Sequence, residues 1–204
     1  EANRVTTVKP AGTTSLTVGT SSGVHAWHSP YYIRRIRVGK NEPIYTYLLI
    51  NHPDLVKDEF FRPHDTAVIS VPQKAPEGAI TRNESAINLL DRVKNVHINW
   101  VNEGHRKGQN TNNVSATITV KPNEWEKVGD WMWNNRKHYN GLAILPFSEH
   151  TYKQAPFEEC SEETYNKMLK SLVSVDLNDV VESEDNTDLS GEIACAGGSC
   201  DLVF

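Results

Sequence analysis

The sequence predicts an α/β fold in which helices pack on a sheet that is at least partly parallel. The main indication is a strand–helix–strand pattern over residues 113–147, because two strands joined through a helix normally run parallel. A second is the helical spacing of apolar residues over 83–102. Hydrophobic residues make up 38% of the 204 residues, which is enough for a packed core.

The amino-terminal third predicts short elements. Residues 10–28 are rich in small side chains and predict a loop or the start of a helix. Residues 31–38 (YYIRRIRV) alternate β-branched and basic side chains, which is typical of a half-buried strand with one basic face. Residues 41–50 open with asparagine, glutamate and proline, which favours a short helix.

The middle of the chain continues this alternation. Residues 51–65 predict helical pieces and loop, and residues 66–72 predict a buried strand that Pro72 should end. The helix expected over 83–102 carries its apolar stripe on Leu89, Leu90, Val93, Val96, Trp100 and Val101.

The strand–helix–strand unit follows. Residues 113–120 alternate apolar and polar side chains, and residues 122–138 carry acids near the start and bases near the end, as a helix dipole favours. We expect Trp125, Val128 and Met132 to form the apolar stripe of this helix. Residues 141–147 (GLAILPF) then predict a fully buried strand.

A last helix is predicted after Ser161, its expected cap, with apolar side chains at Tyr165, Met168, Leu169 and Leu172. The periodic pattern fails after Val175. We therefore expect one domain over residues 1–175 and a flexible, acidic tail over residues 176–204.

Composition narrows the functional classes. The formal charge of −5 does not suggest a nucleic-acid-binding domain, and no apolar run approaches the length of a membrane span. Three cysteines are too few for a secreted disulfide framework, so the sequence predicts a reducing, cytoplasmic location.

The stretch VKPAGTTSLTVG, residues 8–19, has two interpretations. It is an ordinary turn of small residues, or its amides converge on an anion at the start of a helix. In the second case glycine lets the backbone approach closely, and the neighbouring hydroxyls add donors. The candidate residues are Pro10, Ala11, Gly12, Thr13, Thr14 and Ser15.

Two cysteines near the carboxyl terminus form a second candidate. Cys195 and Cys200 flank AGGS, and a disulfide between them would close a small flexible loop suited to thiol–disulfide exchange. The alternative is two incidental surface thiols. A zinc site would need two more ligands, which only Cys160 and scattered histidines could supply.

Two further features are better explained by structure than by chemistry. His25 and His28 have a spacing that metal ligands use, but two histidines are not a site, and a structural role is favoured. Cys160 precedes a helix, where a thiolate could be stabilised, but an incidental thiol is the better interpretation.

Several motifs, taken in order, resemble the class II, adenosylcobalamin-dependent ribonucleotide reductases. They are KPAGTTSLTVGTSSGVH with YYIRRIRV, PQKAPEGAITRNESAI, VSATITVKPNEWEKVGDWMW, LPFSEHTYKQAPFEEC and the terminal CAGGSC. The resemblance runs across nearly the whole chain. It implies the carboxyl-terminal part of a ten-stranded α/β barrel, in an enzyme that reduces ribonucleotides by a thiyl-radical mechanism.

The resemblance also implies site residues. Residues 10–15 correspond to the stretch that binds the substrate phosphates, although Ala11 stands where the family usually has serine. Pro146 and Phe147 end a strand whose end faces the substrate. Cys195 and Cys200 correspond to the pair that reduces the active-site disulfide and is itself reduced by a thioredoxin-like partner.

The chain also departs from the family. It lacks the loop with the radical cysteine and both paired reducing cysteines of the barrel interior, so we expect it to need the amino-terminal portion of the reductase. Adenosylcobalamin would then be bound by the complete enzyme. One alternative is a catalytically incomplete binding or thiol-redox module. Another is the carboxyl-terminal part of a class I large chain, disfavoured because GLAILPFSEHTY lacks the tyrosine pair of that class.

Overall fold

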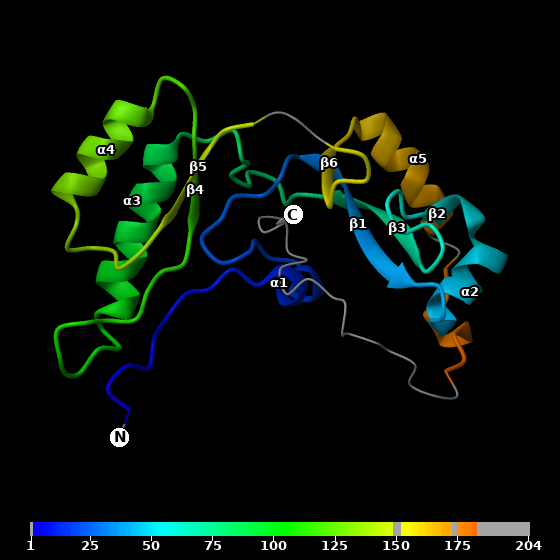
Figure 1. Ribbon diagram of the computed structural model, residues 1–204, viewed down its shortest axis with the longest axis horizontal. Helices are drawn as coiled ribbons and strands as arrows, with labels where there is room; N and C mark the ends of the chain where they lie inside the picture. Colours follow the sequence, from blue (N-terminus) through cyan, green and yellow to red (C-terminus); the bar gives the residue numbers. More distant parts are fainter. Residues whose placement is uncertain (1, 149–151, 173–174, 183–204) are drawn as a thin grey trace. The chain divides into compact units, whose positions relative to one another are not determined.

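The computed structural model describes residues 2–148, 152–172 and 175–182. The chain divides into two compact units, and each is formed by two separate segments. Unit 1 comprises Glu1–Trp27 and Gly78–Glu149, and unit 2 comprises His28–Glu77 and His150–Phe204. Helices and strands occur in both units (Figure 1), which confirms the predicted mixed α/β class.

Unit 1 contains the predicted strand–helix–strand pattern. Its two strands pair in parallel, with Thr117 opposite Ala143 and Val120 opposite Pro146, and a helix connects them. The prediction of a parallel pair is therefore confirmed. The elements of this unit are α1 (Gly12–Val18), α3 (Ala86–Val96), the π-helical segment η2 (His97–Val101), β4 (Thr117–Val120), α4 (Trp125–Asn134) and β5 (Ala143–Pro146).

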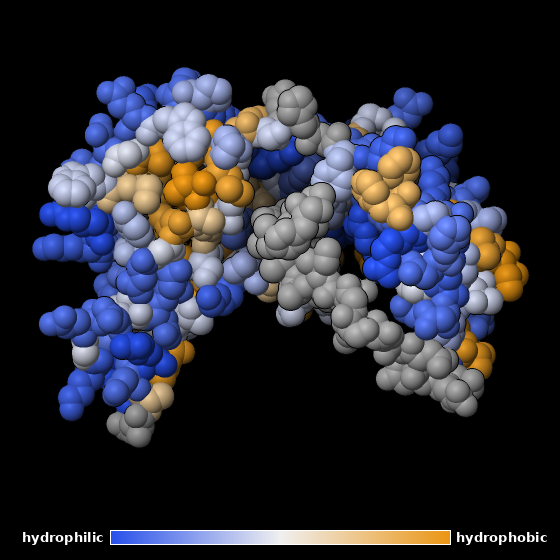
Figure 2. Space-filling view, viewed as in Figure 1, coloured by the Kyte–Doolittle hydropathy of each residue, from blue (hydrophilic) through white to orange (hydrophobic). Residues whose placement is uncertain are grey.

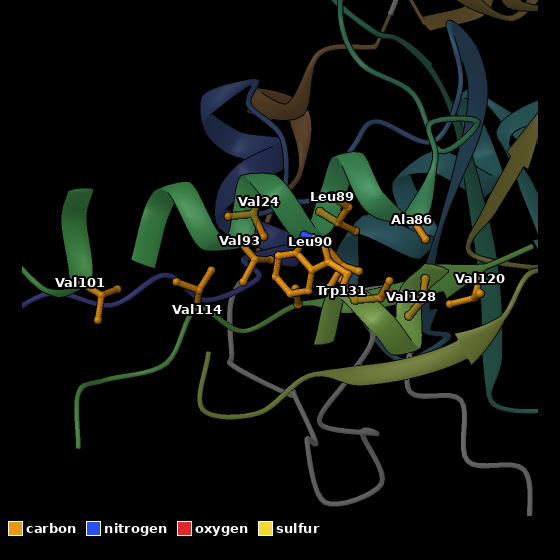
Figure 3. Close-up of a cluster of buried hydrophobic side chains, with 12 residues drawn as sticks. Val24, Ala86, Leu89, Leu90, Val93, Val101, Val114, Val120, Val128 and Trp131 are labelled. Carbon is orange, nitrogen blue, oxygen red and sulfur yellow. The ribbon is translucent and has the colours of Figure 1, made fainter. Parts of the chain in front are cut away.

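The core of unit 1 lies between α3, α4 and β4. Leu90 and Val93 of α3 are fully buried and lie close to Trp131 of α4 (Figure 3). Trp131 can be buried because its Nε1–H donates to an Asp91 carboxylate oxygen at 2.7 Å. The prediction that Trp125 contributes to this stripe is wrong, because Trp125 is the first residue of α4 and 45% exposed.

Strand β5 is not the fully buried strand that its composition predicts. Leu145 is 45% exposed, and Ala143 and Pro146 are exposed as well. Among the described residues β5 pairs only with β4, so its other edge has no partner strand. Figure 2 shows apolar side chains gathered over this pair of strands.

Unit 2 is built on a four-stranded antiparallel sheet with the order β2-β3-β1-β6. The predicted strand and short helix at residues 31–50 are confirmed as β1 and α2. The elements of unit 2 are β1 (Tyr31–Gly39), α2 (Pro43–Asn51), the 3₁₀ segment η1 (Pro53–Leu55), β2 (Val56–Asp58), β3 (Thr66–Lys74), β6 (Phe157–Glu159), α5 (Glu162–Leu172) and the 3₁₀ segment η3 (Leu177–Asp179).

Pro72 does not end its strand, contrary to the prediction. Strand β3 continues to Lys74, with Pro72 opposite Ile33 of β1. On its other side β3 pairs with β2 only over Ala67–Ile69, so at Pro72 that side of the strand has no ladder partner among the described residues. A proline is tolerated there because no ladder bond needs its missing N–H.

Helix α5 begins as its sequence predicts. The backbone N–H of Thr164 donates to the Ser161 hydroxyl oxygen at 3.1 Å, so Ser161 caps the helix. At its other end, Leu172 packs against the core cluster of unit 2, which includes Val38, Leu48 and Ala67.

His97 makes the stability of unit 1 dependent on pH. Its side chain is buried, and burial, followed by the nearby charge of His138, lowers the pKa of the ring. As the pH falls, the His97 ring therefore binds a proton more readily in the unfolded chain than in the folded chain. Its contribution to folding stability is present above the unfolded pKa and is lost as the pH falls. Between about pH 7.5 and about pH 5.5 we expect the urea midpoint to fall, and less so in His97→Leu. An equal fall in both proteins would contradict this assignment.

Candidate functional site

The candidate phosphate loop, residues 10–15, follows a segment that pairs with residues 114–115, just before β4. Val8 forms a parallel bridge with Val114, and the N–H of Ser115 donates to the carbonyl of Val8 at 2.9 Å. The Lys9 ammonium donates to the Ser115 hydroxyl, also at 2.9 Å. The chain thus enters the loop along the segment that leads into β4.

Helix α1 begins inside this loop. Ser15 is the first residue whose N–H reaches a carbonyl of the same turn, that of Ala11 at 3.1 Å. The amides of Gly12, Thr13 and Thr14 therefore belong to the first turn, where helix geometry provides no internal acceptor. The Ser15 hydroxyl is buried and donates to the carbonyl of Gly12 at 3.2 Å.

The chain then turns back on the loop. Helix α1 ends at Val18 and is capped by Gly19, whose positive φ of 65° is the left-handed conformation that glycine favours. Gly23 also has a positive φ, and a Cβ there would lie 2.7 Å from the carbonyl oxygen of Lys9. This close approach brings Ser22 to the loop, where its hydroxyl oxygen accepts from the N–H of Ala11 at 3.0 Å.

His25 joins the same network, which sequence reasoning did not foresee. Its Nε2 accepts from the N–H of Thr117 at 3.0 Å, and its Nδ1 lies 2.9 Å from the carbonyl oxygen of Ser22. The ring is thus tied to protein groups at both nitrogens, in line with the structural role favoured by its sequence context. His28 contacts the rings of Tyr32 and Phe157.

Pro146 and Phe147 lie at the carboxyl end of β5, the end of a parallel strand at which α/β proteins place ligands. The N–H of Phe147 donates to the carbonyl of Val120 at 2.8 Å. The Lys121 ammonium lies 5.6 Å from the centre of the Phe147 ring and donates to the carbonyl of Asn83 at 2.8 Å. Lys121 is a cation at this strand end that the sequence did not single out.

The redox pair lies outside the described residues, as Cys195 and Cys200 both fall within 183–204. Cys160 is partly buried, and burial, followed by the charges of Glu158 and Glu159, raises the pKa of its thiol. A reactive thiolate is therefore not favoured at Cys160, which agrees with an incidental thiol. Across the described residues, no group of three or more histidine, cysteine, aspartate or glutamate side chains could hold a metal ion.

Among the described helices, none is long and apolar enough to span a membrane. No family model matches the chain. Comparison with curated proteins does find relatives. The chain is 25% identical over 206 residues to the adenosylcobalamin-dependent ribonucleoside-triphosphate reductase of Levilactobacillus brevis, a match that covers 97% of this chain and 26% of the relative.

Two further relatives give the same result. A probable adenosylcobalamin-dependent ribonucleoside-triphosphate reductase of Dictyostelium discoideum is 28% identical over 207 residues, covering 97% of this chain and 25% of that protein. The adenosylcobalamin-dependent ribonucleoside-triphosphate reductase of Euglena gracilis is 28% identical over 172 residues. That match covers 83% of this chain and 22% of that protein.

A crystal structure of a B12-dependent, class II ribonucleotide reductase has the same fold over the shared region. The TM-score is 0.69 at 24% identity, with 85% of this chain and 23% of the other covered. The chain thus spans about a quarter of the length of the proteins it matches. Over almost its whole length it is similar to adenosylcobalamin-dependent ribonucleoside-triphosphate reductases, which confirms the resemblance that its motifs predict.

Proposed function

We propose that this chain is the carboxyl-terminal portion of an adenosylcobalamin-dependent reductase that converts ribonucleoside triphosphates to 2′-deoxyribonucleotides. The observation that carries the proposal is the similarity over 97% of the chain to about a quarter of each such reductase. The remaining portion would supply the radical cysteine and the paired reducing cysteines, which this sequence lacks. Adenosylcobalamin belongs to the complete enzyme, and none of its contacts is assigned to the described residues.

Within this proposal, residues 10–15 bind the substrate phosphates. The amides of the first turn of α1 supply hydrogen-bond donors without an internal acceptor, and the anchored segment before them fixes their position. Ala11 offers no hydroxyl, so the backbone donors carry most of the interaction. Pro146 and Phe147 would face the substrate from the carboxyl end of β5.

The exposure of β5 supports a protein partner. Parallel sheets normally have both faces covered, yet Leu145 is 45% exposed and the outer edge of β5 has no partner strand among the described residues. An apolar strand of this kind is expected to pair with further strands. The missing portion of a ten-stranded barrel would supply them and would cover Leu145.

Reconstitution tests the proposal. The chain is mixed with the matching amino-terminal portion of the reductase, adenosylcobalamin, a ribonucleoside triphosphate and a small dithiol, and deoxyribonucleotide is assayed. We expect product only when both polypeptides are present. The small dithiol makes this assay independent of the tail cysteines.

Two other outcomes would contradict the proposal. Association of the two portions without product would favour the catalytically incomplete binding module. No association would leave a stand-alone thiol-redox role, for which the missing radical cysteine is the supporting observation. Each portion assayed alone is the control.

A further inference from the structure

We propose that His25 is a positioning residue that fixes the candidate phosphate loop on strand β4. The inference rests on the proposed function in so far as the loop binds phosphate, but its structural part stands on the contacts of unit 1. His25 lies in the segment that follows α1 and turns back on the loop, residues 20–27, which we call the return segment. Its ring joins the return segment to Thr117, the first residue of β4.

The contacts define the tautomer of the ring. The N–H of Thr117 donates to Nε2 at 3.0 Å, so Nε2 carries no proton. The proton of the neutral imidazole is then on Nδ1, which donates to the carbonyl oxygen of Ser22 at 2.9 Å. Both ring nitrogens are thereby satisfied only in the neutral ring with the proton on Nδ1.

The same contacts lead to the loop. The carbonyl of Ser22 also accepts from the backbone N–H of His25 at 3.1 Å, so two hydrogen bonds from His25 hold Ser22 in place. Its hydroxyl oxygen accepts from the N–H of Ala11, the residue immediately before the first turn of α1. The path from β4 to the loop is therefore Thr117, His25, Ser22 and Ala11, one hydrogen bond at each step.

This path gives the loop a second attachment, in addition to that of its entry segment. The entry segment is fixed by Lys9 and Val8, which bond to Ser115. Without the imidazole, the return segment, which holds Ser22 and His25, would lose its hydrogen bond to Thr117 of β4, and the N–H of Ala11 would lose a fixed acceptor. A loop held at one side only would present its first-turn amides in several arrangements, which weakens binding of a polyanion.

The first test is amide hydrogen exchange of the full chain, followed by mass spectrometry. His25→Phe keeps a planar ring and removes both hydrogen bonds. We expect exchange over residues 10–18 to rise on the order of tenfold, because two ordinary hydrogen bonds are lost. Exchange over α3 should stay as in the unchanged protein.

Conservative variants separate the effect of the His25 hydrogen bonds from the effect of side-chain size. His25→Asn retains a donor for Ser22, and His25→Gln retains an acceptor for Thr117, so each should show an intermediate increase in exchange. His105→Phe is the matched control, because the His105 Nε2 is hydrogen-bonded to the carbonyl of Gly108 in its own turn and not to the loop. It should leave exchange over residues 10–18 unchanged.

The second test uses the complex with the amino-terminal portion. His25→Phe should raise KM for the ribonucleoside triphosphate while kcat changes little, and His25→Gln should lie between. Unchanged exchange over residues 10–18 in His25→Phe would overturn the proposal, and so would an equal rise over α3. If the unchanged complex makes no product, the proposed function fails, while the exchange result still decides whether His25 positions the loop.

Discussion

Replacing both Cys195 and Cys200 by serine should reduce deoxyribonucleotide formation to background when thioredoxin and its reductase are the only reductants. The physical reason is that, in the proposed enzyme, each turnover would leave the active-site cysteines as a disulfide that must be reduced before the next turnover. The thiolate of Cys195 or Cys200 would attack that disulfide, form a mixed disulfide and release one active-site thiol. The second thiolate would then resolve the mixed disulfide.

The exchange is balanced in electrons and protons. The active-site pair would gain two electrons and two protons, and Cys195 and Cys200 would become a disulfide that thioredoxin would reduce in turn. A small dithiol reaches the active site directly, so it should restore the activity of the double variant. Reconstituted enzyme assayed with each reductant measures both effects.

Cys160→Ser is the matched control for this experiment. Burial raises the pKa of the Cys160 thiol, so little thiolate is available, and the variant should match the unchanged protein with either reductant. If the double variant keeps full activity with thioredoxin, Cys195 and Cys200 are not the shuttle. If the small dithiol fails to restore activity, the two cysteines have a role other than electron transfer.

Leu90→Ala should lower the folding stability of unit 1 by more than any other substitution that we propose. Leu90 is fully buried in the core of unit 1, and removing its side chain leaves a cavity between α3 and α4. We expect the free energy of unfolding to fall by about 2–5 kcal/mol. Urea unfolding followed by tryptophan fluorescence measures this directly, because all five tryptophans lie in the segments of unit 1.

Val5→Ala is the control for the core substitution. Val5 also lies in unit 1 and is 61% exposed, so its truncation should change the unfolding free energy by less than about 0.5 kcal/mol. Equal losses in the two variants would show that Leu90 does not hold the core of unit 1.

Local patterns predicted most elements, because they depend on neighbouring residues. The spacing of Leu89, Leu90 and Val93 indicated α3, and the hydroxyl of Ser161 indicated the start of α5. Strands β2 and β6 were not predicted. Each has three residues, too few for a period to be visible, and β6 exists because residues 157–159 pair with β1 from far along the chain.

Side-chain burial was less predictable than the elements. The composition of residues 141–147 is that of a buried strand, but burial depends on which strands are present beside it, and β5 has only β4 among the described residues. Trp125 and Trp131 are equally apolar by type. Which of them is buried depends on the start of α4 and on the carboxylate of Asp91, neither of which a helical stripe reveals.

The candidate site was predicted only in its parts. Residues 10–15 carry a local signal, because glycine and hydroxyl residues lie next to one another there, whereas Pro146 and Phe147 follow only from the family resemblance. His25 and Lys121 were missed as contributors, since their contacts lie 92 residues away at Thr117 and 38 residues away at Asn83. The sequence singled out His25 only for its spacing from His28, which does not specify a hydrogen-bond partner.

The division of unit 1 into two segments has a consequence for synthesis on the ribosome. Lys9 bonds to Ser115, a residue 106 positions later, and Val8 bridges Val114. The candidate phosphate loop therefore emerges long before the residues that hold it, whereas the sheet residues of unit 2 from Tyr31 to Lys74 are made in between. Bringing Lys9 and Ser115 together closes a long stretch of chain, and the entropy cost of doing so slows the step. The loop should consequently be among the last parts of the described chain to become ordered, and pulse-labelled nascent chains would show protease protection there only after Thr117 has left the exit tunnel.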